Sequence, residues 1–416
     1  MMILLNDIFV SEFTGKPFEI SNSSEGLDRA GTLFWMRTIL FGNHQNYNSL
    51  LRTAFQWLAV IILLASVSLE TGAQEHSWES PLKRCWSFSN PNPSRNSPAS
   101  DNEKIFIPTS TGTIIALDQR TGSLAWQADL GGNLETNVMF YKGQLFASAI
   151  FGNGSDGVTR ALLRKINPET GIPFWQYEGS KAPVFFAERN FQGMPLTMHR
   201  EGGIVRLDSN GKSVWSKEID AQITTPVAKT GTKLVFGTAN KTIVIMDYGN
   251  DDELAQVNLS GVPASIVVSD RGIIFTADGS GNVYALDTDT QRIIWKTKTG
   301  AGISKLSIFG RDVIVSSKDN FVYRVSGLNG KKIWKRKLAG RVLGSVFLDD
   351  THAVFVTSGA STALLIDLEN GNLTNKIDLG EPFASGPVRI AGGFAVPTSS
   401  AITAVTPNDC ATKKTA

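Results

Sequence analysis

The residues that decide the fold are Tyr284-Ala-Leu-Asp-Thr-Asp-Thr-Gln-Arg-Ile-Ile-Trp295, a short strand, a polar turn and a second strand that ends on a tryptophan. Five other segments have the same form, and four of them also end on tryptophan. They are residues 115–126, 165–175, 205–215, 323–334 and 365–373. A hairpin repeated this often is the building unit of the fold, so the number of copies and the way they close define the architecture.

The composition favours a large, strand-rich and nearly neutral protein. Of the 416 residues, 42% are hydrophobic and 39 are glycine, which suits many short strands joined by tight turns. Forty basic and 38 acidic residues give a formal charge of +2, so electrostatics offers no basis for nucleic-acid binding. Two cysteines without a CxxC or CxxCH motif exclude a cysteine zinc site and c-type haem attachment.

The N-terminal 73 residues are expected to serve export. Residues 1–50 form an irregular extension, interpreted either as a mis-called start before Met36 or as a cytoplasmic tail. Residues 51–73 contain an uncharged apolar run at 54–69 and small residues before a cleavage point after Ala73. The run is short for a span of about 20 residues, which favours a signal peptide over an uncleaved anchor. Both alternatives place the rest of the chain in the periplasm or outside the cell, with a membrane tether only through an uncleaved 54–69 segment.

One repeat can be followed completely between residues 265 and 298. Three apolar strands are separated by two glycine-containing turns, and a fourth strand carries Trp295. Four antiparallel strands in about 40 residues is the period of a β-propeller blade. The equivalent positions on the fourth strands are Trp126, Trp175, Trp215, Ala255, Trp295, Trp334 and Asn375, at spacings of 49, 40, 40, 40, 39 and 41.

The two ends of the chain are expected to share the eighth blade. One step of 40 before Trp126 is Trp86, which stands in an isolated apolar segment. Residues 386–405 supply three strands that lack a fourth. Joining the N-terminal strand to them removes the exposed edges of an open array. The predicted fold is therefore an all-β, eight-bladed propeller of four-stranded antiparallel blades over residues 80–408, followed by a tail at 409–416.

The two cysteines are expected to form a disulfide that locks the ends of the chain together. In the register of the intact repeat, Cys410 corresponds to Gln291 and Cys85 to Ile294, and these two positions face each other across a hairpin turn. An exported compartment permits the bond. Closing a loop of several hundred residues stabilises the fold by about 4–5 kcal/mol on loop-entropy grounds. The alternative is two free buried thiols.

The pattern Ala-Leu-Asp-x-x-Thr-Gly-x-x-x-Trp at residues 116–126 resembles the repeat of the PQQ-like, quinoprotein-type propellers. The resemblance covers residues 80–408. It implies an eight-bladed propeller, of the kind found in quinone-dependent dehydrogenases and in binding propellers of the Bam type that assist outer-membrane protein assembly. The repeated tryptophans are expected to be structural, because their large apolar area can pack one blade on the next. They are Trp86, Trp126, Trp175, Trp215, Trp295 and Trp334.

No catalytic, cofactor-binding or metal-binding residue is predicted. The dehydrogenases that the repeat resembles are longer and carry two adjacent bridged cysteines, which this sequence lacks. His199 and His352 are interpreted as ordinary surface or strand residues, and Asp118 and Asp287 as turn caps. The protein is therefore expected not to be an enzyme. The alternative is a quinoprotein-like enzyme or sensor that binds pyrroloquinoline quinone (PQQ) with calcium at the central channel.

The 49-residue spacing is the one departure from the regular repeat. The excess lies near residues 150–160, in the hairpin between the second and third strands of blade 2, and an aromatic segment of blade 3 follows. Aromatic and arginine side chains beside a loop are typical of interaction surfaces, although a tolerated surface insertion is the alternative. The residues predicted to bind a partner are Phe151, Asn153, Asp156, Arg160, Phe185, Arg189 and Phe191. The sequence thus favours an exported, monomeric, non-catalytic scaffold for a protein partner, in cell-envelope or outer-membrane protein assembly.

Overall fold

The computed structural model describes residues 78–134, 136–151, 160–179, 183–186, 196–247, 253–407 and Cys410. The chain divides into two compact units, Met1–Glu75 and His76–Ala416, and all described residues belong to the second. Their regular structure consists of β-strands arranged in eight sheets. We call each sheet a blade, and we call its strands A to D from the centre of the ring outwards. Seven blades have four strands, whereas blade 2 has five.

The first four blades follow one another along the chain. Blade 1 contains β2 (Ala99–Ser100), β3 (Lys104–Pro108), β4 (Thr113–Asp118) and β5 (Leu124–Asp129). Blade 2 contains β6 (Asn133–Leu134), β7 (Met139–Tyr141), β8 (Gln144–Phe151), β9 (Arg160–Ile166) and β10 (Pro173–Gly179). Its two short strands, β6 and β7, both pair with β8 and share position A. Blade 3 contains β11 (Pro183–Phe186), β12 (Leu196–His199), β13 (Gly203–Leu207) and β14 (Ser213–Glu218). Blade 4 contains β15 (Ala228–Thr230), β16 (Lys233–Gly237), β17 (Thr242–Asp247) and β18 (Glu253–Asn258).

The last four blades complete the ring. Blade 5 contains β19 (Pro263–Val268), β20 (Ile273–Asp278), β21 (Asn282–Asp287) and β22 (Ile293–Lys298). Blade 6 contains β23 (Ile303–Phe309), β24 (Asp312–Ser317), β25 (Phe321–Val325) and β26 (Lys332–Lys337). Blade 7 contains β27 (Val342–Phe347), β28 (His352–Thr357), β29 (Thr362–Asp367) and β30 (Leu373–Asp378). Blade 8 contains β31 (Val388–Ile390), β32 (Gly393–Pro397), β33 (Ala401–Thr406) and, as its outer strand, β1 (Lys83–Ser89).

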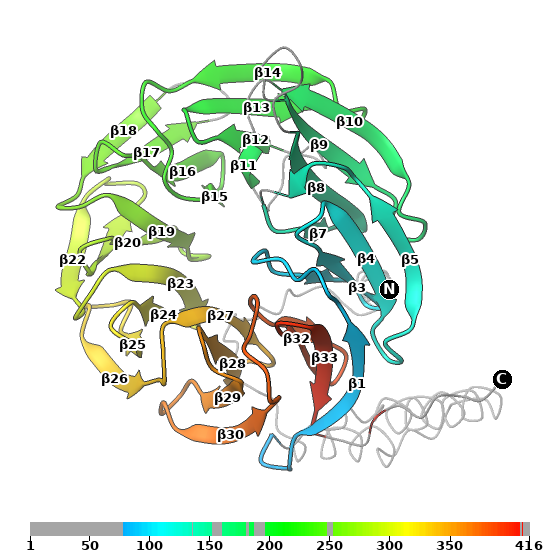
Figure 1. The fold of residues 1–416 in the computed structure, drawn as a ribbon. Helices are drawn as coiled ribbons and strands as arrows, with labels where there is room; N and C mark the ends of the chain where they lie inside the picture. Colours follow the sequence, from blue (N-terminus) through cyan, green and yellow to red (C-terminus); the bar gives the residue numbers. More distant parts are fainter. Residues whose placement is uncertain are drawn as a thin grey trace, which may run out of the picture. The chain divides into compact units, whose positions relative to one another are not determined.

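The ring closes as the sequence predicts. Strand β1 pairs with β33, so that the first and last strands of the ring lie side by side (Figure 1). Trp86 pairs with Ala404 after a register shift, just as Trp295 pairs with Ala285 in blade 5. The structure also contains the expected disulfide, which joins Cys85 to Cys410 across 325 residues with a Cα–Cα distance of 5.1 Å.

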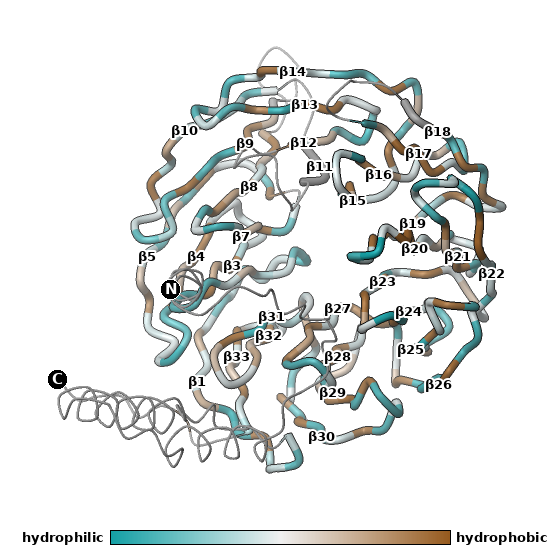
Figure 2. Tube along the Cα trace, turned by 180° about the vertical axis from the view of Figure 1, so that it is seen from behind, coloured by the Kyte–Doolittle hydropathy of each residue, from teal (hydrophilic) through white to brown (hydrophobic). Residues whose placement is uncertain are grey.

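Alternation along the B and C strands produces the core. In β4, Ile114 and Ala116 pack against blade 2, whereas Ile115 and Leu117 pack against blade 8. Because successive side chains of a strand point to opposite faces, each blade buries one set of residues against each neighbour. Figure 2 shows the resulting distribution, with hydrophobic residues along the strands and hydrophilic ones at many of the turns. The core is therefore a series of layers between blades rather than one central cluster.

Where a D strand carries the repeated tryptophan, that side chain packs its blade against the next one. Trp126 donates from Nε1 to the carbonyl of Pro168 at 2.8 Å, and Trp295 donates to Gly327 at 2.8 Å. The glycine of the receiving turn lies directly under the ring. A Cβ at Gly171, whose φ is +75°, would stand 2.6 Å from the Trp126 ring. Glycine is therefore required there both for its positive φ and for the space the indole occupies.

Blade 7 uses a different tryptophan, because its D strand carries Asn375 at the docking position. Trp78, which precedes β1, packs into the core between blades 7 and 8 with a relative exposure of 6%. The Asn375 amide donates to the carbonyls of Trp78 at 3.0 Å and Ser80 at 2.7 Å. The propeller thus includes residues 78 and 79, ahead of the boundary at residue 80 that the repeat alone indicates.

Candidate functional site

The two ends of the blades give the ring two distinct faces. We call the end that carries the A–B and C–D turns the AB face. We call the end that carries the B–C turns and the connections between blades the BC face. Neighbouring strands of a blade are antiparallel, so successive turns along the chain lie on alternate faces. The strand order therefore tells on which face each turn lies.

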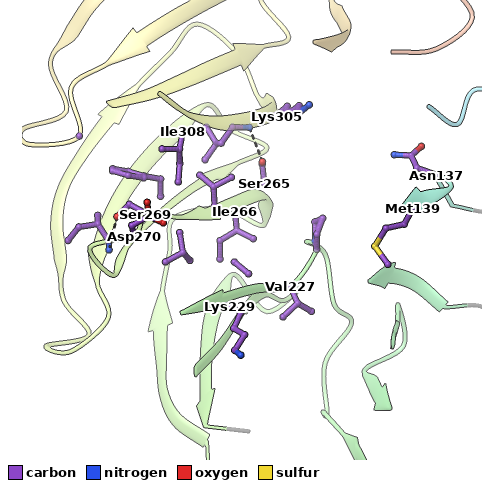
Figure 3. A pocket seen from close by; sticks show the side chains of 18 of the residues that line it. Asn137, Met139, Val227, Lys229, Ser265, Ile266, Ser269, Asp270, Lys305 and Ile308 are labelled. Atoms are coloured by element: carbon purple, nitrogen blue, oxygen red, sulfur yellow. Dashed lines mark hydrogen bonds between the residues drawn. The ribbon is translucent and has the colours of Figure 1, made fainter. Parts of the chain in front are cut away.

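A cavity of about 1470 Å³ occupies the centre and extends to the AB face. Its wall is formed mainly by the innermost strands β7, β15, β19 and β23, and by turns of blades 5 and 6. In Figure 3, Asn137 and Met139 border the open centre on one side, and Lys305 and Ser265 border it on the other. The cavity is therefore bounded by side chains from several blades, not by one loop.

The innermost strands are basic. Lys229, Lys305 and Arg389 lie in β15, β23 and β31, and none of the eight innermost strands that the structure describes contains an aspartate or glutamate. The Lys305 ammonium also donates to the Ser345 carbonyl on β27 at 3.3 Å. A group of like charges around a cavity raises the local concentration of ligands of the opposite charge. Of the three, Lys229 and Lys305 line the cavity, so its wall carries positive charge.

Carboxylates lie instead at the B–C turns, where they hold the hairpins of blades 5 and 6. The buried Asp278 accepts hydrogen bonds from Asn282 and from the Tyr284 hydroxyl at 3.0 Å. In blade 6, Asp319 accepts from the Tyr323 hydroxyl at 2.6 Å. Burial, followed by the hydrogen bond and the charge of Asp319, raises the pKa of Tyr323 to about 12. These carboxylates are structural because tyrosine and backbone donors already bind them.

This geometry predicts that Tyr323 ionises late. Its folded-state pKa lies above the ordinary value of about 10, so the stability it contributes is complete below that pH and is lost as pH rises towards about 12. Asp319→Asn is expected to lower the pKa of Tyr323 towards the ordinary value. The tyrosinate absorbance of Tyr323→Phe, subtracted from that of the wild type at each pH, isolates the titration of Tyr323. The same subtraction is made for the pair of proteins that also carry Asp319→Asn. An identical Tyr323 titration in both backgrounds would contradict the assignment.

The hairpin of blade 2 is longer than its counterparts and lies on the BC face. Strands β8 and β9 contain eight and seven residues, and their last pair is Phe151 with Arg160. The Phe151 ring packs over Gly131 and lies 5.8 Å from the Arg164 guanidinium, which donates to the Leu130 carbonyl. Burial lowers the pKa of Arg164. Phe151 therefore fixes the base of this hairpin, while Asn153 and Asp156 lie outside the described residues.

The blade 3 residues fall at a different place in the ring. Phe185 lies in the innermost strand β11, where its backbone pairs with Met198. Arg189 and Phe191 lie outside the described residues, but the strand ends that flank them, Phe186 and Leu196, lie at the AB end of blade 3. Phe151 and Arg160 lie at the BC end of blade 2. The structure thus does not bring these two sets of strand ends together on one face.

The two histidines of the propeller also stand apart. His199 is buried at the end of β12 on the BC face, and His352 starts β28 on the AB face, where its Nδ1 lies 3.3 Å from Asp349. Among the described residues, no three or more His, Cys, Asp or Glu side chains are placed to hold a metal ion. The same part of the chain contains no helix that is long and apolar enough to cross a membrane.

Comparison with known proteins relates the chain to one family. A family profile described as outer membrane protein assembly factor BamB matches residues 64–238 and 239–407. The protein of that name from Yersinia pestis is 23% identical over 266 residues, which is 58% of this chain and 65% of the relative. The one from Shewanella oneidensis is 21% identical over 290 residues, 66% of this chain and 61% of the relative. The alignments thus span less than two thirds of the length of these relatives.

Solved structures share the architecture. The crystal structure of BamB from Moraxella catarrhalis superposes with a TM-score of 0.61 at 16% identity, covering 78% of this chain and 97% of that one. The computationally designed Ika8 protein superposes with a TM-score of 0.67 at 14% identity, covering 77% of this chain and 99% of that one. Because a designed protein matches as well as a natural one, the superposition shows the fold alone.

Proposed function

This chain belongs to the outer membrane protein assembly factor BamB family, and we propose that it is an exported, non-catalytic propeller that binds a protein partner during outer-membrane protein assembly. The observation that supports this most is the combination of the family match with a ring closed by a disulfide. Such a bond is typical of oxidising compartments outside the cytoplasm. Loss of the protein from its host is expected to reduce the amount of folded outer-membrane protein, measured in isolated envelopes.

The partner site that we propose is the blade 2 hairpin on the BC face. Its base is rigid, because the Phe151 ring is packed against Gly131 and Arg164. The segment beyond it, residues 152–159, contains Asn153 and Asp156 and interrupts an otherwise regular repeat. A long loop on a rigid scaffold is a common arrangement for binding. Arg160, at the base of the hairpin, belongs to the same proposed site. Phe185, Arg189 and Phe191 are proposed as a separate contact, because the strand ends of that segment lie at the AB end of blade 3.

Shortening this hairpin is expected to weaken partner binding without unfolding the ring. Replacing residues 152–159 by Asn-Gly closes the Phe151–Arg160 pair with a two-residue turn that suits a hairpin. We expect capture of the partner to fall on the order of tenfold or more, as for loss of a binding hot spot. Cross-linking in envelopes, followed by quantitative mass spectrometry of the captured proteins, measures the change.

A shuffled loop of the same length and composition provides the matched control. If the side chains of residues 152–159 contact the partner, the shuffled loop is expected to bind as poorly as the shortened one. Melting temperatures of all three proteins should agree, because the core of blade 2 is unchanged. Undiminished capture by both variants would refute the proposed site while leaving the scaffold function open to mapping elsewhere.

The proposed function includes neither catalysis nor a cofactor. Asp278 and Asp319, carboxylates of the type that bind calcium, already accept hydrogen bonds from Tyr284 and Tyr323. The alternative of a PQQ-binding enzyme or sensor has a direct test. Titration of the full chain with PQQ and calcium, followed by near-ultraviolet absorbance and dye-linked oxidation, is expected to show no saturable change.

A further inference from the structure

We infer that the groove between blades 5 and 6 on the AB face binds an extended, acidic peptide segment of a partner protein. The groove is the outward part of the central cavity. It lies on the face opposite to the blade 2 hairpin, so this inference goes beyond the function proposed above. It gives the scaffold a second binding surface with a defined ligand chemistry.

Three turns border the groove, and apolar side chains from one of them and from the adjoining strands line it. The three turns are the A–B turn of blade 5 at residues 269–271, the A–B turn of blade 6 at 310–312 and the C–D turn of blade 6 at 327–328. Leu328 is 82% exposed and Ile294 is 48% exposed. Apolar side chains of the lining at this end include Val268, Ile273, Ile294, Ile308 and Leu328. Exposed aliphatic side chains beside a cavity are suited to binding an apolar part of a ligand.

Hydrogen bonds fix the walls in place. The Leu306 amide donates to the Ser265 hydroxyl at 3.0 Å, which joins the innermost strands of blades 5 and 6. The Gly327 amide donates to the Asp312 carboxylate at 3.1 Å, which joins the two turns of blade 6. A groove that already has its binding shape does not lose further conformational entropy when a ligand enters. The site is therefore pre-organised.

The charge of the lining is strongly biased towards cations. Its basic residues are Lys229, Arg271, Lys305 and Arg311. Its acidic residues are Asp270 and Asp312, and the Asp312 carboxylate accepts from the Arg324 Nε at 2.7 Å. Asp270 is thus the one lining carboxylate that is not bound by an arginine in the described structure. In a chain that is nearly neutral as a whole, this sector is complementary to an acidic ligand.

The size and the spread of charge favour a peptide over a small anion. The cavity of about 1470 Å³ exceeds the roughly 300–1,000 Å³ of typical small-molecule sites. Its cations extend from Lys305 on the innermost strand to Arg271 and Arg311 at the turns, and the same lining contains the aliphatic side chains named above. An extended chain presents successive side chains on opposite sides. A segment in which acidic and apolar residues alternate can therefore meet both the arginines and the aliphatic wall.

Binding of a defined peptide to the full chain tests this inference. The probe is a fluorescein-labelled peptide of alternating glutamate and leucine, followed by anisotropy. The variant Arg271→Glu/Arg311→Glu is expected to weaken binding on the order of tenfold, because two attractions become repulsions. Raising the salt concentration should weaken binding to the wild type more than to the variant. Both arginines are exposed, so the fold should be unaffected, and circular dichroism and melting verify this.

A matched variant controls for overall charge. Arg120→Glu/Lys212→Glu makes the same change in net charge at exposed C–D turns of blades 1 and 3 on the same face, and it should leave binding unchanged. A peptide of alternating lysine and leucine should prefer the Arg271→Glu/Arg311→Glu variant to the wild type. Leu328→Ser tests the apolar wall separately, and it should also weaken binding of the glutamate peptide.

Three results would overturn the inference. The first is equal affinity of the glutamate peptide for the wild type and for Arg271→Glu/Arg311→Glu. The second is equal affinity of the wild type for the glutamate and lysine peptides, which would mean non-specific apolar association. The third concerns flotation with vesicles of anionic lipid. If the wild type floats with the vesicles, Arg271→Glu/Arg311→Glu does not, and both bind the glutamate peptide equally, the inference fails. That outcome would assign the groove to a membrane surface instead.

Discussion

Replacing Trp78 by alanine is expected to lower the free energy of unfolding by about 3–5 kcal/mol, the usual range for truncating a buried tryptophan. The side chain is 6% exposed and packs beside Leu348 and Leu379 between blades 7 and 8. Its Nε1 donates to the Asp349 carboxylate, which would lose a donor as well as apolar neighbours. Denaturant unfolding of the full chain measures the change. It is monitored by far-ultraviolet circular dichroism, because the variant removes a tryptophan and so alters the fluorescence signal.

Two further variants separate the packing of the Trp78 ring from its hydrogen bond and from the effect of any truncation in blade 7. Trp78→Phe keeps an aromatic ring but removes the donor to Asp349, so it should cost clearly less than alanine. Leu373→Ala changes a 37% exposed side chain of β30 in the same blade and is expected to cost well under the Trp78→Ala change. A Trp78→Ala protein as stable as Leu373→Ala would mean that the indole does not hold blades 7 and 8 together.

Trp78 also shows where sequence reasoning stops. The blades, their order and the closure by β1 could be predicted because a repeat of about 40 residues fixes the register of every hairpin, even across 325 residues for Cys85 and Cys410. Trp78 stands outside that period. The repeat shows only that positions 255 and 375 lack the tryptophan, and a missing landmark does not say whether another residue takes its place or which one does.

The candidate binding surfaces were less predictable for a related reason. The longer blade 2 hairpin was visible because it breaks the period. The cationic groove does not break it, since Arg271 and Arg311 occupy ordinary turns of regular blades. Its character depends on residues 40 apart in sequence that become neighbours only when the ring is assembled. Likewise, Phe185 looked close to the hairpin in sequence, but its strand lies at the innermost position of blade 3.

Removal of the disulfide is expected to be the second large effect. Cys85→Ser/Cys410→Ser should lower the free energy of unfolding by about 2–5 kcal/mol, because the bond closes a loop of 325 residues and so restricts the unfolded chain. Reduction of the wild type should give the same loss, whereas reduction of the double variant should change nothing. Equal stability of the oxidised wild type and the double variant would mean that the bond does not constrain unfolding.

The combination of both changes distinguishes two ways in which the bond could act. Strand β1 keeps six residue pairs with β33 in addition to the disulfide, so we expect it to remain in blade 8 after reduction. Trp78, five residues before the start of β1, would then stay in its pocket, and the two losses should add within about 0.5 kcal/mol. If β1 instead detached from the native ring, Trp78 would leave with it, and its replacement would cost much less in the reduced protein. If the two losses add, and if β33 keeps its protection from hydrogen exchange after reduction, β1 stays in the native ring without the bond. The disulfide then stabilises the protein by restricting the unfolded chain.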